Sequence, residues 1–249
     1  MNRRLFLQKI ASVLAMLGLP VGLFGGKPAA ASTKGGKAAN KPWYGMGVDV
    51  DKCIGCGRCM DACKMENDVP REPFFFRTWV ERYVVKNDGD VNIQSIGTLT
   101  NPTSEVVAER DILRSFFVPK LCNQCANPPC VQVCPVGATF QTEDGVVLVN
   151  SETCIGCRYC IQACPYGARY LHPETDTADK CTFCYHRISK GLLPACVEVC
   201  PTQARVFGDT HSVASPLARL KRMNKIFVLK PHLNTEPKVY YANLDGEVK

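Results

Sequence analysis

The sequence lacks the short motifs that bind nucleotides or build a hydrolase site. It contains no glycine-rich dinucleotide motif, no P-loop and no recognisable catalytic triad. Histidine is scarce as well, since the 249 residues include only His172, His186, His211 and His232. We interpret these four as surface or hydrogen-bonding residues rather than metal ligands. The sixteen cysteines described below would be enough to bind metal without them.

A long hydrophobic run is also missing. The weakly apolar segment 10–24 covers about 15 residues, whereas a membrane span needs about 20. It follows Arg3 and Arg4 and precedes small residues that end at Ala31, an order typical of an export signal. The paired arginines resemble the Tat type, although Asn2 and Gln8 depart from its usual pattern.

We therefore expect residues 1–31 to be a Tat-type signal peptide, cleaved near Ala31, and the mature protein to be periplasmic. The Tat system carries folded cargo, so a protein exported in this way is folded in the cytoplasm first. An ordinary secretory signal or a retained anchor is the alternative. No cysteine occurs in the first 50 residues, which argues against a lipoprotein anchor.

Cysteine, in contrast, is abundant: the chain has sixteen, in four groups. The third group has the spacing C-x2-C-x2-C-x3-C-P, which is typical of a bacterial ferredoxin; its residues are Cys154, Cys157, Cys160, Cys164 and Pro165. In such a run three thiolates bind one 4Fe–4S cluster. The fourth lies on a short helix and points at a second cluster, and the proline then ends that helix.

The first group repeats this spacing unchanged, and the second and fourth widen the middle gap to four and eleven residues. These three groups are Cys53, Cys56, Cys59 and Cys63; Cys122, Cys125, Cys130 and Cys134; and Cys181, Cys184, Cys196 and Cys200. A disulfide scaffold gives no reason for the repeated two-residue gaps. Zinc sites usually use two ligand pairs separated by a long loop, which only the last group resembles. The pattern favours iron–sulfur clusters, with a zinc or disulfide structural protein as the alternative.

The net charge does not indicate a nucleic-acid partner. The formal charge is +7, but residues 1–31 hold four basic side chains and no acidic one, so the mature chain carries +3. Each oxidised cluster with its four thiolates adds about −2, which takes a four-cluster protein to roughly −5.

The order of the groups predicts an α+β fold of two nested ferredoxin-like units. We expect these segments: a linker at 32–43, a first half-motif at 44–69, an insertion at 70–118, a central ferredoxin-like domain at 119–178, a fourth cluster motif at 179–210 that completes the outer unit, and a C-terminal tail at 211–249 that wraps around the body. Local patterns predict strands at 46–50, 116–120 and 145–149 and near 227 and 239, and helices at 58–66 and 216–223.

The insertion is rich in aromatic and β-branched residues. Residues 74–85 and 91–96 predict a β-hairpin with a turn at Asp88-Gly89. A polar segment follows, where a short helix from Ser104 is one option. We expect the aromatic residues to pack against the cluster-bearing body, with a docking face for a partner as the alternative.

Charged and aromatic residues flank two of the cysteine groups. Arg158, Tyr159, Arg169 and Tyr170 surround the third group, where hydrogen bonds or charge would raise the reduction potential of a cluster; ordinary surface packing is the alternative. The first group is followed by Lys64 instead of proline. This lysine either neutralises cluster charge or is a solvated surface residue.

Several motifs around the cysteines resemble those of one family. They are Cys63-Lys64-Met65-Glu66-Asn67, Leu121 to Cys130, Cys164-Pro165-Tyr166-Gly167-Ala168-Arg169, Asp179 to Cys184, Leu193 to Cys196, Phe207-Gly208-Asp209 and Val228 to Pro231. Over residues 44–245 the chain resembles the four-cluster iron–sulfur subunits of the DMSO-reductase superfamily, especially the polysulfide and tetrathionate reductase type. Its insertion at 86–115 is longer than in shorter members of the family.

The resemblance implies four 4Fe–4S clusters whose ligands are exchanged between groups. The implied ligand sets are Cys53, Cys56, Cys59 and Cys200 for cluster 1; Cys181, Cys184, Cys196 and Cys63 for cluster 2; Cys122, Cys125, Cys130 and Cys164 for cluster 3; and Cys154, Cys157, Cys160 and Cys134 for cluster 4.

The resemblance also implies an electron-transfer subunit without catalytic residues, held at the membrane by a partner. Such subunits connect a polytopic quinone-reactive membrane subunit with a catalytic subunit. We expect the catalytic partner to be a molybdopterin oxidoreductase of a sulfur or arsenic oxyanion; a multihaem cytochrome, as in nitrite-reducing systems, is the alternative. A self-contained redox enzyme is disfavoured, because the chain has no nucleotide or substrate motif.

Overall fold

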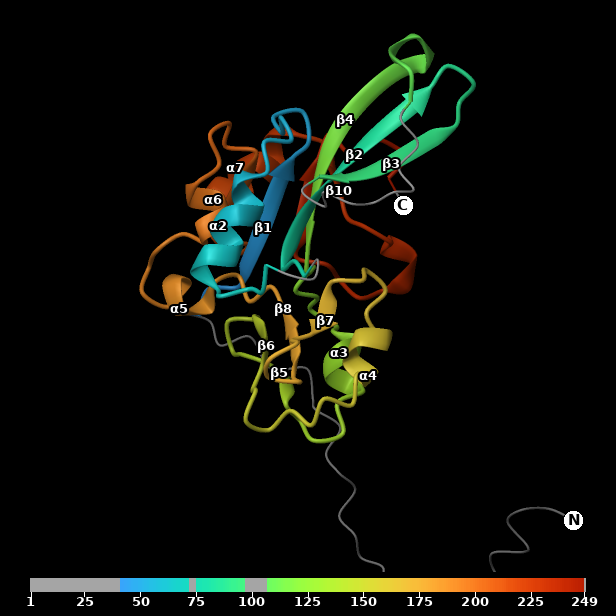
Figure 1. Ribbon diagram of the computed structural model, residues 1–249. Helices are drawn as coiled ribbons and strands as arrows, with labels where there is room; N and C mark the ends of the chain where they lie inside the picture. Colours follow the sequence, from blue (N-terminus) through green and yellow to red (C-terminus); the bar gives the residue numbers. More distant parts are fainter. Residues whose placement is uncertain (1–40, 72–74, 97–106, 249) are drawn as a thin grey trace, which may run out of the picture. The chain divides into compact units, whose positions relative to one another are not determined.

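The structure is a computed structural model that describes residues 41–71, 75–96 and 107–248 (Figure 1). The expected signal peptide, almost all of the linker and the optional helix from Ser104 lie outside these residues. Within the described ranges, no helix is both long enough and apolar enough to cross a membrane.

The first sheet combines strands from both ends of the described chain. Its order is β10–β11–β1–β9, formed by Ile226–Phe227, Val239–Ala242, Tyr44–Asp49 and Arg205–Asp209. Strand β1 pairs in parallel with β11 and antiparallel with β9. The segment expected to wrap around the body as a tail therefore supplies an inner strand, whose Val239 and Tyr241 are fully buried.

The alternation of side chains along β1 explains how helix α7, Pro216–Met223, packs on this sheet. Met46 and Val48 are fully buried in the core. Gly47 alternates with them, and a Cβ atom there would collide with Leu220 of α7, so only glycine lets the helix approach this closely. Ser215 caps the helix, since its hydroxyl accepts a hydrogen bond from the backbone N–H of Ala218 at 3.1 Å. The predicted helix at 216–223 is confirmed.

The insertion forms the second sheet, in the order β3–β2–β4. These antiparallel strands are Val91–Ile96, Thr78–Lys86 and Ile112–Leu121, and a 3-10 turn at Glu109–Asp111 precedes β4. The predicted hairpin is confirmed, although its first strand begins at Thr78. Tyr241 of the first sheet donates a hydrogen bond to the carbonyl of Pro119 at 3.1 Å, and Tyr83 belongs to the same core as Met46. The insertion therefore shares its core with the first sheet.

The cysteine loops lead into short helices and two small hairpins. Strands β5 and β6, Thr139–Gln141 and Val147–Val149, form one hairpin, and β7 and β8, Arg169–Leu171 and Ala178–Lys180, form the other. The helices are α2 at Arg58–Glu66, α3 at Pro129–Gln132, α4 at Tyr159–Gln162, α5 at Tyr185–Ile188 and α6 at Ala195–Glu198, and a 3-10 turn lies at Pro231–Leu233.

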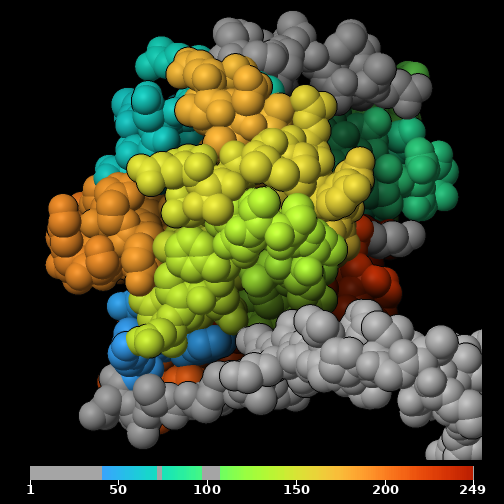
Figure 2. Space-filling model, turned by 90° about the horizontal axis from the view of Figure 1, so that it is seen from below, coloured from blue at the N-terminus to red at the C-terminus, as the bar shows by residue number. Residues whose placement is uncertain are grey.

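Two helix pairs follow from this arrangement. Helix α3 contacts α4 within the central segment, and α2 contacts α6, which joins the first cysteine group to the last. In Figure 2 the central segment, coloured yellow-green to yellow, forms one continuous patch on the face shown. The helices of the first and last cysteine groups are therefore in contact, although they are far apart in the sequence.

Candidate metal centres

The cysteine loops use left-handed backbone at repeated positions. Gly55 and Gly57 in the first loop have φ values of +68° and +74°, and Gly156 and Arg158 take the same places in the third loop with +67° and +66°. A Cβ atom at Gly156 would collide with the carbonyl oxygen of Asp176, so this position needs glycine. The repeated turns curl the loops and explain the shared two-residue spacing of the first three cysteines in each of these groups.

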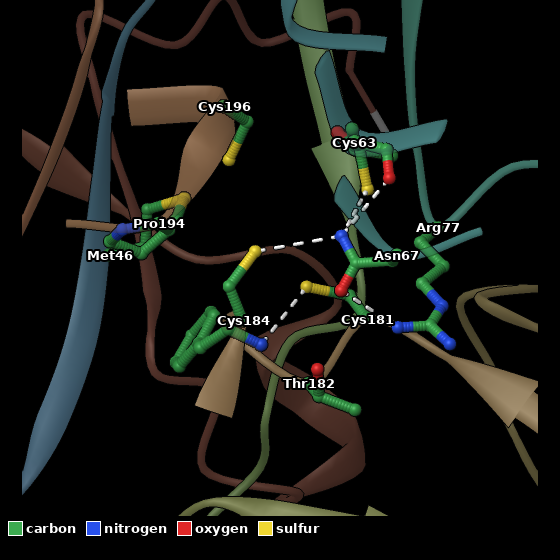
Figure 3. Close-up of a pocket in the computed structure, with 11 residues that line it drawn as sticks. Met46, Cys63, Asn67, Arg77, Cys181, Thr182, Cys184, Pro194 and Cys196 are labelled. Atoms are coloured by element: carbon green, nitrogen blue, oxygen red, sulfur yellow. Dashed lines mark hydrogen bonds between the residues drawn. The ribbon is translucent and has the colours of Figure 1, made fainter. Parts of the chain in front are cut away.

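Three cavities are each lined by four cysteines. The first contains Cys53, Cys56, Cys59 and Cys200; the second, drawn in Figure 3, contains Cys63, Cys181, Cys184 and Cys196; the third contains Cys122, Cys125, Cys130 and Cys164. In each cavity three cysteines come from one group along the chain and the fourth comes from another group. All sixteen cysteines are free thiols in the structure.

Asn67 connects helix α2 to the second cavity. Its Nδ2 atom donates a hydrogen bond to the carbonyl of Cys63 at 3.0 Å and lies 3.6 Å from the sulfur atoms of both Cys63 and Cys184. Figure 3 shows this amide between the two sulfur atoms. Arg77 in turn donates to the Asn67 side-chain oxygen at 3.0 Å. Asn67 therefore ends α2. It also provides a hydrogen-bond donor to sulfur at the first cysteine group, the only one of the four that is not followed by proline.

The four remaining cysteines are Cys134, Cys154, Cys157 and Cys160. Cys160 is buried in a small cluster with Val147 and Ala178, and Cys154 packs against it. The backbone N–H of Thr139 lies 3.4 Å from the sulfur of Cys134, and that of Ala178 lies 3.5 Å from the sulfur of Cys154. Cys157 is exposed. This set is held around α3 and α4 by packing and backbone donors, and part of it reaches the surface.

The surroundings of the thiols suit a cationic metal core. Burial raises the pKa of Cys125 to about 12 and that of Cys196 to about 11, and it raises the pKa of Cys181 well above its usual value. Burial also opposes ionisation of Cys134 and Cys200, but backbone N–H donors hold the pKa of both below the usual value. Because a coordinated metal deprotonates a thiol outright, iron would supply the positive charge that these buried sulfurs lack.

The histidines take part in other contacts. His186 lies 2.7 Å from Glu66, His211 stacks on Trp43, and the ring of His172 accepts a hydrogen bond from the backbone of Glu174. Among the described residues, no three Cys, His, Asp or Glu side chains lie close enough together to hold a single metal ion. The cysteines instead stand apart around cavities.

Two arginines reach cysteine sulfur from inside the core. The Nη2 atom of Arg169 lies 3.1 Å from the sulfur of Cys130, and that of Arg205 lies 3.4 Å from the sulfur of Cys59. The candidates chosen from sequence include Arg169 but omit Arg205. A repeat in the sequence identifies both, because each arginine is the fifth residue after a cysteine that precedes proline, Cys164 or Cys200.

The other flanking candidates are exposed or make structural contacts. Arg158 and Tyr159 are exposed. Tyr170 donates a hydrogen bond to Asp179 and stacks on Phe75 with ring centroids 4.8 Å apart. These contacts do not place Arg158, Tyr159 or Tyr170 against sulfur.

Lys64 serves the turn after α2. Its ammonium group donates to the carbonyls of Pro70 and Arg71 and lies 4.1 Å from the centroid of the Phe76 ring. Phe75 and Phe76 therefore pack against residues of the cluster-bearing body, as expected of the insertion's aromatic residues.

Comparison with known proteins identifies the chemistry of these centres. Two family models, both described as a 4Fe-4S dicluster domain, match residues 52–138 and 113–210. A subunit of tetrathionate reductase from Salmonella typhimurium is 45% identical over 204 residues, which are 81% of this chain and 73% of that protein. A component of polysulfide reductase from Wolinella succinogenes is 38% identical over 79% of this chain and 92% of its own length. Protein NrfC of Escherichia coli is 41% identical over 79% of each chain.

These matches cover the cysteine groups and leave no place for the zinc or disulfide alternative. The sixteen cysteines and the two dicluster matches establish 4Fe–4S clusters as the cofactor. The identities exceed what a shared fold alone would require and extend over most of the chain. The protein therefore belongs to the iron–sulfur electron-transfer subunits of the DMSO-reductase superfamily, of the tetrathionate and polysulfide reductase type.

Proposed function

We propose that the protein is a periplasmic relay with four 4Fe–4S clusters, which passes electrons between a quinone-reactive membrane subunit and a catalytic redox subunit. The observation that carries the proposal is the grouping of cysteines from distant parts of the chain around three cavities. It supports the ligand sets that exchange Cys200, Cys63 and Cys164 between groups. By the same exchange, the fourth cluster takes Cys154, Cys157, Cys160 and Cys134.

Electrostatic interactions between neighbouring sets support a single series of clusters. Cys59 of the first set and Cys196 of the second both act electrostatically on Arg205. Cys181 of the second set is near Cys122 of the third, and Arg169 is near Cys130 of the third and Cys160 of the fourth. Bound clusters would supply the redox chemistry by changing the valence of iron, while the protein holds them in order and excludes water from the inner ones.

The names of the relatives support a sulfur compound as the terminal substrate. Two of the proteins above are named for tetrathionate and polysulfide, so we propose a molybdopterin oxidoreductase of a sulfur oxyanion or a related compound as the catalytic partner. Purification of the tagged protein with its partners from gently solubilised membranes tests this. Molybdenum and a polytopic membrane protein should co-purify; haem c in place of molybdenum would favour the multihaem cytochrome instead.

The periplasmic location depends on residues 1–31, which are outside the described structure. We propose that Arg3 and Arg4 direct Tat export before cleavage near Ala31. Replacement of both by lysine should leave the precursor in the cytoplasm, as measured by fractionation and by the mass of the chain. Normal export of the double variant would contradict the Tat assignment without affecting the cluster assignment.

A further inference from the structure

Four basic side chains are buried in the core, and none of them forms an ion pair among the described contacts. An acidic side chain, Asp144, interacts with one of them, Lys238. The other three are Arg205, Lys180 and Arg169, which expose 2%, 0% and 5% of their surface. Arg205 reaches the sulfur of Cys59 and donates to the hydroxyl of Thr78 at 2.8 Å, and its Nη1 atom is buried without a hydrogen-bond partner. A buried charge without a counter-charge is strongly unfavourable.

The other two side chains are in the same situation. Lys180 donates hydrogen bonds to the carbonyls of Val147 and Cys181, and Arg169 donates to the sulfur of Cys130 and the hydroxyl of Thr139. Carbonyl and hydroxyl oxygens satisfy the N–H groups, but they do not neutralise the charge. The negative charge that these residues require must come from the thiolates and the clusters they bind.

The position of each cation relative to the cysteine sets is systematic. The thiolates that act on Arg205 are those of Cys59 and Cys53 in the first set and Cys196 in the second. Those that act on Lys180 are Cys122 and Cys130 in the third set and Cys181 in the second.

Arg169 completes the series, because the thiolates of Cys130 and Cys122 in the third set and Cys160 in the fourth act on it. Burial lowers the pKa of all three side chains. The thiolates raise the pKa of Arg169 and of Arg205 above the usual value, whereas the pKa of Lys180 stays below it. Two buried arginines thus lie at junctions between successive sets. Arg205 contacts sulfur of the first set and interacts with a thiolate of the second, and Arg169 contacts sulfur of the third set and interacts with a thiolate of the fourth.

We propose that Arg205 and Arg169 are positioning residues for electron transfer, each holding a fixed positive charge between two neighbouring clusters. The inference rests on the proposed four-cluster relay. Reduction adds one electron and no proton, so a cluster goes from about −2 to about −3. A positive charge in a low-dielectric gap stabilises that product on both sides and weakens the repulsion between neighbours. Each cation therefore raises two reduction potentials and lets adjacent clusters be reduced together.

Redox titration of the anaerobic holoprotein, monitored by EPR, tests the proposal. The neutral variants are Arg205→Gln and Arg169→Gln; the variants that keep the charge are Arg205→Lys and Arg169→Lys. Arg158→Gln is the matched control, because Arg158 flanks a cysteine group but is exposed, where solvent and salt screen its charge. Iron and sulfide per chain are measured for every variant.

Each neutral variant with full iron content should make two clusters harder to reduce, by about tenfold or more in the ratio of reduced to oxidised cluster. For a one-electron couple a factor of ten is about 59 mV. The variants that keep the charge and Arg158→Gln should each shift the ratio by less than about threefold. A neutral variant that loses iron while its charged counterpart keeps it would also support the proposal.

Two results would overturn the proposal while leaving the relay intact. One is a set of fully loaded neutral variants whose potentials match that of Arg158→Gln. The other is equal loss of iron from neutral and charged variants, which would show that shape and not charge is required. A wild-type chain without iron would instead contradict the proposed function itself, and this inference with it.

Discussion

The Nη2 atom of Arg205 lies 3.4 Å from the sulfur of Cys59, although 146 positions separate the two residues. Cys200, close to Arg205 in sequence, lines the same cavity as Cys53 and Cys56. The contact joins the first and last cysteine groups through the pairing of β1 with β9 and of α2 with α6. The cysteines that line one cavity are therefore brought together by the fold and not by proximity in sequence.

The exchange of ligands between groups predicts which cysteine variants share a defect. Cys200→Ser and Cys56→Ser should remove the same EPR signal and about four irons each, because both line one cavity. Cys63→Ser should share its lost signal with Cys184→Ser, its neighbour in the second cavity. If Cys63→Ser instead removes the same EPR signal as Cys56→Ser, each cluster takes all its ligands from one cysteine group. The proposed exchange of ligands between groups would then be wrong.

The series arrangement predicts that loss of one cluster interrupts the whole relay. Cys157→Ser changes an exposed ligand of the fourth set, so it should disturb the fold little. Turnover of the assembled complex with quinol should stop, while quinone binding by the membrane subunit stays normal. Tyr159→Phe, an exposed neighbour that keeps all ligands, is the control and should retain turnover. Full turnover of the Cys157→Ser complex would exclude a single series.

Gln124 is predicted to be a major determinant of stability. Its side chain is fully buried, donates to the carbonyl of Cys181 at 2.6 Å and accepts from the backbone N–H of Val147 at 2.7 Å. Gln124→Leu leaves the backbone N–H of Val147 without this acceptor and the carbonyl of Cys181 with only the hydrogen bond from Lys180, which should cost about 1–3 kcal/mol. Gln132→Leu, at an exposed site, should change stability by less than about 0.5 kcal/mol. Anaerobic urea denaturation measures both, and equal midpoints would contradict the role assigned to Gln124.

The close approach of α7 to β1 predicts that Gly47 tolerates no side chain. Gly47→Ala would place a methyl group against Leu220 and 2.8 Å from Val206, which should cost about 1–3 kcal/mol. Gly246→Ala is the control, because nothing lies within 4 Å of the added atom. In the double variant with Leu220→Ala, the cost of the alanine at position 47 should fall. If urea denaturation gives the same cost for Gly47→Ala with and without Leu220→Ala, the added methyl group does not contact Leu220.

Much of the local structure was predictable because its signals are local. The spacing of the first cysteine group and the polar positions after it predict helix 58–66, which is α2, and Ser215 with Pro216 mark the start of α7. The turn at Asp88-Gly89 predicts the hairpin of β2 and β3. Each of these elements is specified by adjacent residues, and no distant partner is needed to recognise it.

The long-range features were not predictable in the same way. Strand β11 lies beside β1, with Met46 opposite Val239, but both strands are too short for their pairing to be read from pattern alone. Arg205 is charged, and charge ordinarily indicates an exposed position. It is buried against the sulfur of Cys59, where by our proposal a cluster supplies its counter-charge, and composition and periodicity do not show this. The exchanged ligand sets, likewise, came from family resemblance rather than from spacing.

The most direct test of the account is the measurement of iron and acid-labile sulfide per chain in anaerobically purified protein, with EPR of the dithionite-reduced sample. Four clusters of four irons and four sulfides predict about sixteen of each and a spectrum of interacting spins. Zinc, or metal-free protein with oxidised thiols, would contradict the central claim.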